Sequence, residues 1–108
     1  MRTNSVQLIG YVGQDLSEKT LPSGDKKISL RVATTHSFKD KEGKVNYSST
    51  WHDVIAWDEV AEYAGNNFVK GSKILVEGTI VYRTYPDHHG HTRYVTEIKA
   101  TSLQNLDR

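Results

Sequence analysis

A stretch near the middle of the chain, residues 50–57, contains both tryptophans of the protein. If this stretch is a β-strand, alternation places Trp51 and Trp57 on one face, together with the carboxylate of Asp53. The two indoles would lie about 20 Å apart at about 3.3 Å per residue. Large aromatic rings are usually buried, so packing in a core is the simpler interpretation for either indole alone. The acidic residue between them favours a surface on which a flat ligand stacks.

Length and composition limit the class of protein. A chain of 108 residues predicts one domain, residues 1–108, with a modest core. The chain has no cysteine, which excludes disulfides and thiolate metal sites and fits a reducing cytoplasm. No apolar run is long enough to span a bilayer, so no membrane partner is expected. The net charge of +1 is too balanced to indicate a polyanionic partner. A basic surface would have to come from basic residues that the fold gathers on one face.

The pattern of apolar residues predicts the elements that position these side chains. Alternation predicts five strands, over residues 5–12, 27–35, 47–57, 73–85 and 91–103. A helix is expected over residues 58–67, between the third and fourth strands, with Asp58 capping its start. The segment 14–26 is polar and carries a turn signal at residues 22–25, and the charged segment 36–46 is expected to be a loop around Gly43. This arrangement predicts an all-β fold: a five-stranded antiparallel barrel of the OB-fold type with one short helix, whose second and third strands commonly bind oligonucleotides.

Six segments between about Asn4 and Leu103 resemble the bacterial single-stranded DNA-binding protein family in order and spacing. They are residues 6–15, 30–34, 50–52, 70–72, 76–78 and 93–97. The resemblance implies an OB-fold that assembles as a homotetramer built from dimers and wraps single-stranded DNA without sequence preference. It further implies a role in DNA replication, recombination and repair, and a cytoplasmic, nucleoid-associated location.

The resemblance also implies which residues form the site. Bases stack on aromatic rings in this family, and the matching positions here are Phe38, Trp51, Trp57 and Tyr85. Better-known members have tryptophan in place of Phe38 and Tyr85, and phenylalanine in place of Trp57. Since all four positions remain aromatic, the stacking chemistry is retained. His52 matches a family position at the subunit contact.

A protein that binds any sequence needs π-surfaces and cations, because every base has a flat face and every nucleotide a phosphate. Base–aromatic stacking contributes about 1–3 kcal/mol per base, so four platforms would outweigh most other terms in a near-neutral protein. The candidate phosphate contacts are Lys19, Arg31, Lys39, Lys41, Lys70 and Arg83. The remaining tyrosines are interpreted as edge or core residues: Tyr11, Tyr47, Tyr63, Tyr82 and Tyr94.

Some features depart from the family pattern. Asp53 and Glu59 stand where well-known members carry basic residues. They favour an alternative function, an OB-fold protein-interaction subunit with weak DNA binding, similar to a primosome accessory protein. An RNA-directed OB module is a third interpretation. The family usually continues into a flexible tail whose acidic tip recruits repair enzymes, and no segment here resembles it, so tail-mediated partners are not expected.

Three histidines, at positions 88, 89 and 91, surround a predicted hairpin tip. Imidazoles bind zinc, but adjacent spacing points neighbours apart, so no metal site and no cofactor is predicted. In mildly acidic solution the tip is expected to gain positive charge and to bind polyanions more strongly. No Gly-x-Ser-x-Gly elbow, Walker loop or dinucleotide fingerprint occurs in the sequence. The sequence therefore predicts a binding protein and not an enzyme.

Overall fold

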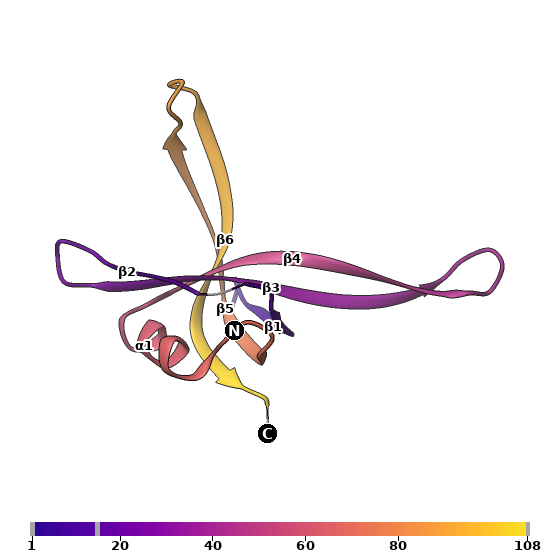
Figure 1. Ribbon diagram of the computed structural model, residues 1–108. Helices are drawn as coiled ribbons and strands as arrows, with labels where there is room; N and C mark the ends of the chain where they lie inside the picture. Colours follow the sequence, from indigo (N-terminus) through magenta and orange to yellow (C-terminus); the bar gives the residue numbers. More distant parts are fainter. Residues whose placement is uncertain (1, 15, 108) are drawn as a thin grey trace.

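The computed structural model describes residues 2–14 and 16–107 (Figure 1). Within these residues it contains one helix, α1 (Asp58–Asn67), and six strands. The strands are β1 (Val6–Val12), β2 (Ser17–Thr20), β3 (Lys26–Lys39), β4 (Val45–Trp57), β5 (Lys73–Pro86) and β6 (Thr92–Asn105).

Five of the strands close into a barrel in the order β1-β5-β6-β4-β3, and β3 returns to β1. β1 pairs with β5 along most of its length and with β3 at Tyr11 and Val12. Gly10 lies at this bend, where an added Cβ would collide with the carbonyl oxygen of Ala33, so a glycine is required. The predicted OB-fold barrel with one short helix is confirmed, although its β4–β6 pairing is parallel.

The charged segment 36–46 contains strand residues, so the prediction of a loop there was wrong. The polar segment 14–26 has the predicted turn after Leu21 and also contains β2, a strand that was not predicted. Most of residues 36–46 extends β3 and β4 into one long hairpin, and β2 pairs with the start of β3 outside the barrel. Both segments have polar residues on both faces, so they lack the apolar alternation that marks a half-buried strand. Backbone pairing with the neighbouring strand stabilises them instead.

The core fills the barrel interior. Its largest fully buried side chains are Val12, Ile28, Leu30, Val32, Val54, Ile74 and Val76. α1 packs against β3, β4 and β6 and buries Ala61 and Ala64. Phe68, directly after the helix, is buried with its ring edge-on to Tyr63, and the ring centroids are 5.6 Å apart. No helix among the described residues is long and apolar enough to cross a membrane.

The start of α1 differs from the expectation. The N-cap residue is Trp57, without a side-chain capping bond, so the prediction that Asp58 caps the helix was wrong. Asp58 is the first helical residue, with φ of 49°, a left-handed conformation that aspartate tolerates better than most residues. Its Oδ1 accepts a hydrogen bond of 3.2 Å from the backbone N–H of Lys26. The carboxylate therefore ties the helix start to β3.

Three hairpins, β2–β3, β3–β4 and β5–β6, project from the barrel as arms (Figure 1). The radius of gyration is 16.0 Å. A compact chain of this length would have about 13 Å, so the arms reach well beyond the barrel.

The turns at residues 40–44 and 87–91, which close two of these arms, are built alike. Each turn begins with an aspartate whose backbone N–H donates to the carbonyl four residues later. The bond from Asp40 to Lys44 is 3.0 Å long, and the bond from Asp87 to His91 is 2.9 Å long. Gly43 and Gly90 have φ of 80° and 79°, a region that favours glycine.

Candidate nucleic-acid interface

Trp51 lies on the outer wall of β4, and 48% of its surface is exposed. The guanidinium carbon of Arg31, on β3, lies 5.1 Å from the centre of the indole. The Nε of Arg31 is also 3.4 Å from Oδ1 of Asp53, its register partner. The indole packs against Gly13, where an added Cβ would collide with the ring. Trp51 is thus a ring that is fixed in place and still half open to solvent, with a cation beside it.

Trp57 forms a second aromatic–cation pair at the end of β4. Its ring is half-buried, and Nζ of Lys27, its register partner on β3, lies 5.5 Å from the ring centre. Lys19 on β2 is in turn the register partner of Lys27. Lys27 therefore lies beside this indole, and Lys19 lies one strand further away. Sequence reasoning proposed Lys19 but missed Lys27, which only the β3–β4 register brings to Trp57.

Tyr85 forms a third pair on the β5–β6 arm. The guanidinium carbon of Arg83 lies 5.7 Å from its ring centre. Nε and an Nη of Arg83 donate to the two carboxylate oxygens of Glu97, at 2.7 and 3.3 Å. These hydrogen bonds, with the charge of Glu97, raise the pKa of Arg83 above its ordinary value. The Glu97 side chain is only 8% exposed, so Arg83 is held beside Tyr85 by a nearly buried carboxylate.

Phe38 is about half exposed near the end of β3, and the ring of His36 is 6.3 Å away between centroids. Its register partner is Asn46, and by strand alternation it faces the opposite side of the hairpin from Trp51. A two-stranded ribbon twists strongly, so a ligand that touches both rings must wind around this arm. Among the described residues, no cation lies over the ring of Phe38.

The remaining predicted phosphate contacts lie near turns. Lys39 ends β3, and Lys41 lies in the turn that follows. Lys70 precedes Gly71, whose backbone N–H donates to the carbonyl of Val12 at 2.7 Å. All three lysines are exposed. The structure therefore brings Arg31 and Arg83 to aromatic rings, places Lys19 one strand away from Trp57, and leaves these three lysines at separate points of the surface.

Three tyrosines contradict the interpretation as edge or core residues. Tyr47, Tyr82 and Tyr94 are the most exposed large hydrophobic side chains of the described chain. They lie on the projecting arms, where both faces of a hairpin contact solvent (Figure 1). Tyr63 is packed as expected, and its hydroxyl accepts a hydrogen bond of 3.1 Å from the backbone N–H of Asn105.

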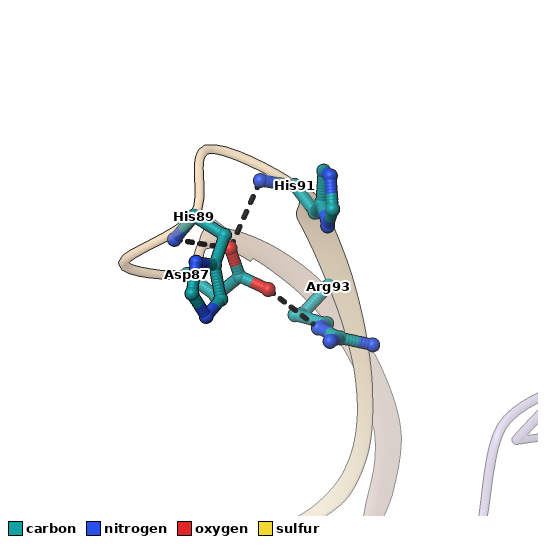
Figure 2. Close-up of polar contacts among 4 residues, drawn as sticks. All are labelled: Asp87, His89, His91 and Arg93. Atoms are coloured by element: carbon teal, nitrogen blue, oxygen red, sulfur yellow. Dashed lines mark hydrogen bonds and ion pairs between the residues drawn. The ribbon is translucent and has the colours of Figure 1, made fainter.

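The histidine tip of the β5–β6 arm is organised by Asp87, as Figure 2 shows. One carboxylate oxygen accepts the backbone N–H groups of His89 and His91, each at 2.9 Å, and the other accepts Nε of Arg93 at 2.9 Å. The hydrogen bond from His91, with the contributions of Arg93 and His89, lowers the pKa of Asp87 below its ordinary value. The described residues hold no group of three His, Cys, Asp or Glu side chains arranged for a metal ion.

His52 points to the other face of β4 from Trp51. Its Nε2 lies 2.9 Å from the hydroxyl of Thr34, and the side chain is half-buried. A hollow of about 370 Å³ is lined by His52, by the aliphatic side chains of Val6, Leu8, Ile80 and Ile98, and by Trp51, Asp53, Thr96 and Glu97.

An OB-fold barrel that carries partly exposed aromatic–cation pairs is typical of oligonucleotide-binding OB-fold proteins, and this chain is of that class. Residues 3–106 match the sequence model of the single-strand binding protein family, and the chain belongs to this family. Members of the family are DNA-binding proteins and not enzymes.

Two relatives support the assignment. The chain is 33% identical over 104 residues to single-stranded DNA-binding protein 1 of Chlorobaculum tepidum, which covers 95% of this chain and 64% of that protein. It is 38% identical over 106 residues to single-stranded DNA-binding protein 1 of Xylella fastidiosa, covering 97% of this chain and 78% of that protein. The chain thus spans roughly two thirds to three quarters of these relatives.

Solved structures show the same fold. The Plasmodium falciparum SSB in complex with single-stranded DNA superimposes with a TM-score of 0.87 at 25% identity, covering 99% of this chain and 97% of that one. A deletion mutant of the single-stranded DNA binding protein from Thermus aquaticus gives a TM-score of 0.82 at 27% identity, covering 96% and 50%.

Proposed function

We propose that this chain binds single-stranded DNA without sequence preference, by stacking bases on Phe38, Trp51, Trp57 and Tyr85. The observation that carries the proposal is the set of three partly exposed rings, each with a cation within 6 Å of its centre. Such pairs offer a base a flat surface and offer its phosphate a positive charge, and neither contact depends on base identity. The family, and a structural neighbour in complex with single-stranded DNA, support this function.

Titration with oligo-dT tests the proposal. Bases that stack on the indoles are expected to quench tryptophan fluorescence. Trp51→Ala is expected to weaken binding by about 1–3 kcal/mol, the contribution of one stacked base. Trp51→Phe, which keeps a ring, is the matched control and should lose much less. Wild-type protein that leaves oligo-dT unbound would refute the proposal.

The phosphate contacts proposed are Lys19, Arg31, Lys39, Lys41, Lys70 and Arg83, with Lys27 added because it lies beside Trp57. If these residues act together, the slope of log affinity against log salt concentration is about −0.7 for each phosphate neutralised on a single strand. A protein-interaction subunit with vestigial DNA binding would instead bind oligo-dT weakly at every salt concentration. Competition between dT and rU oligomers separates DNA from RNA preference.

We further infer that the chain assembles with copies of itself, as a homotetramer built from dimers. The hollow around His52 contains four aliphatic side chains beside Trp51 and the polar Asp53, Thr96 and Glu97. Ile9 and Tyr11 are more than half exposed on the outer side of β1. A second copy would cover the aliphatic side chains of the hollow and of β1. His52→Lys is expected to lower the mass measured by sedimentation, whereas the control His36→Lys, on the same face but out on the arm, should not. An unchanged mass in His52→Lys would remove His52 from the interface.

The cellular role follows from this activity. Replication, recombination and repair all expose single strands that must be covered, and a coat protein acts where those strands arise. We therefore place the protein in the cytoplasm, at the nucleoid.

A further inference from the structure

Tyr47 is an exposed ring on the β3–β4 arm that the site described above does not use. Its surface is 73% exposed, compared with 48% for Trp51 on the same strand. Tyr47 lies four residues before Trp51, so strand alternation places both rings on one face. The register agrees, since their partners Ser37 and Ala33 are also four residues apart on β3. Along the strand the two positions are about 13 Å apart, at about 3.3 Å per residue.

The surface between the two rings is small and polar. Thr35 and Ser49, which are register partners, occupy it, and their hydroxyl oxygens are 3.1 Å apart in a hydrogen bond. These short side chains do not cover the ring of Tyr47, which is 73% exposed. Lys39 lies diagonally across from Tyr47 on the same face, and Arg31 lies beside Trp51. Each end of the row therefore combines an aromatic ring with a cation.

We propose that Tyr47 is a further stacking platform, which extends the single-stranded DNA path from Trp51 along the β3–β4 arm, with Lys39 contacting the accompanying phosphate. This inference rests on the proposed function. Packing does not account for a tyrosine here, because the ring is largely exposed on a hairpin far from the core. Its hydroxyl forms no hydrogen bond within the described residues. A base needs only the π-face of the ring, which is open.

Tyr82 provides a comparison on the other arm. It is 76% exposed, and Tyr94, its diagonal neighbour, shares its face of the β5–β6 hairpin. By alternation, Arg83 and Arg93 lie on the opposite face of that arm. An exposed tyrosine without a cation on its face therefore serves as the matched control for Tyr47.

The test measures the affinity of the assembled protein for a fluorescent oligo-dT of about 16 nucleotides, the upper site size for one OB-fold. Tyr47→Ala is expected to weaken binding by roughly 5- to 150-fold, the range produced by losing one stacked base. Tyr47→Phe keeps the π-face and should stay within about twofold of wild type. Tyr82→Ala should also stay within about twofold. Photocrosslinking of bromodeoxyuridine-substituted DNA should map to Tyr47.

Several results would overturn the proposal. Unchanged affinity in Tyr47→Ala beside a weakened Trp51→Ala would exclude Tyr47 and leave the proposed function intact. Equal losses in Tyr47→Phe and Tyr47→Ala would show that the hydroxyl acts, and not the ring face. An equal loss in Tyr82→Ala would show that the cation on the same face is irrelevant. A changed sedimentation mass in Tyr47→Ala would assign the ring to a subunit contact. Failure of the wild type to bind would instead refute the proposed function itself.

Discussion

Replacing Asp53 by asparagine is expected to strengthen DNA binding. The carboxylate lies 3.4 Å from Nε of Arg31, and the same guanidinium lies 5.1 Å from the centre of Trp51. Asp53 therefore has two opposing effects. It holds Arg31 beside the indole, and it places a negative charge near any phosphate that Arg31 contacts. Asparagine keeps the shape and one acceptor oxygen, so the variant removes the charge and changes little else.

The geometry gives the magnitude. A phosphate bound to Arg31 would lie about 7 Å from the carboxylate, and repulsion between two unit charges at that distance is about 0.6 kcal/mol in water. The high-dielectric value applies because both side chains of the ion pair are about half exposed. Asp53→Asn should therefore bind oligo-dT about threefold more tightly at low salt. Because Arg31 loses its internal partner, it should neutralise a phosphate more fully. The slope of log affinity against log salt concentration should then become steeper by about 0.7.

The assay is fluorescence anisotropy of labelled oligo-dT over a series of salt concentrations. Glu62→Gln is the matched control, since it makes the same change in net charge on an exposed position of α1. Weaker binding by Asp53→Asn would show that positioning of Arg31 outweighs repulsion. Equal gains in both variants would trace the effect to net charge, and either result refutes the reasoning.

Three further changes have defined outcomes. Gly13→Ala should displace the indole of Trp51, because the new Cβ collides with the ring, and should reduce fluorescence quenching by oligo-dT. Arg83→Ala should lower the free energy of unfolding by about 1–3 kcal/mol in denaturant titrations, because the nearly buried Glu97 loses its partner. Asp87 has a lowered pKa in the folded protein, so its stabilisation is present above the ordinary carboxyl value and is lost as pH falls through the folded value. In wild type, the amides at the tip of the β5–β6 arm should therefore exchange hydrogen faster as pH falls through this value, after correction for the intrinsic exchange rate. In Asp87→Asn, this dependence on acid should be absent.

Each of these predictions has its control in the chain. Gly65→Ala adds a methyl group without a close contact and should leave the quenching unchanged. Adding Glu97→Gln to Arg83→Ala should recover part of the lost stability, because a neutral amide is less costly to bury than a carboxylate. The turn of Asp40, whose pKa is also lowered, chiefly by the backbone N–H of Lys44, should keep its acid dependence in Asp87→Asn. If a control variant behaved like the variant that it is paired with, the contact on which that prediction rests would be contradicted.

Much of the fold could be predicted from the sequence because its signals are local. The apolar alternation of Ile28, Leu30 and Val32 marks a wall of the barrel, and all three are fully buried. The helix occupies Asp58–Asn67 as predicted, since Ala61 and Ala64 recur at helical spacing. Family membership likewise follows from short segments in order. None of these features requires knowledge of which strand pairs with which.

The arrangement of the candidate site required the tertiary structure. Lys27 meets Trp57, and Arg31 meets both Asp53 and Trp51, only because the turn at residues 40–44 fixes the β3–β4 register. The outer part of that hairpin, residues 36–46, lacks an apolar alternation, so no hydrophobic pattern along the chain revealed the hairpin's length. The exposure of Tyr47 has the same origin, since a ring on an arm that leaves the barrel has no core to enter. Side-chain types are local properties of a sequence, whereas their neighbours across a sheet depend on pairing between distant segments.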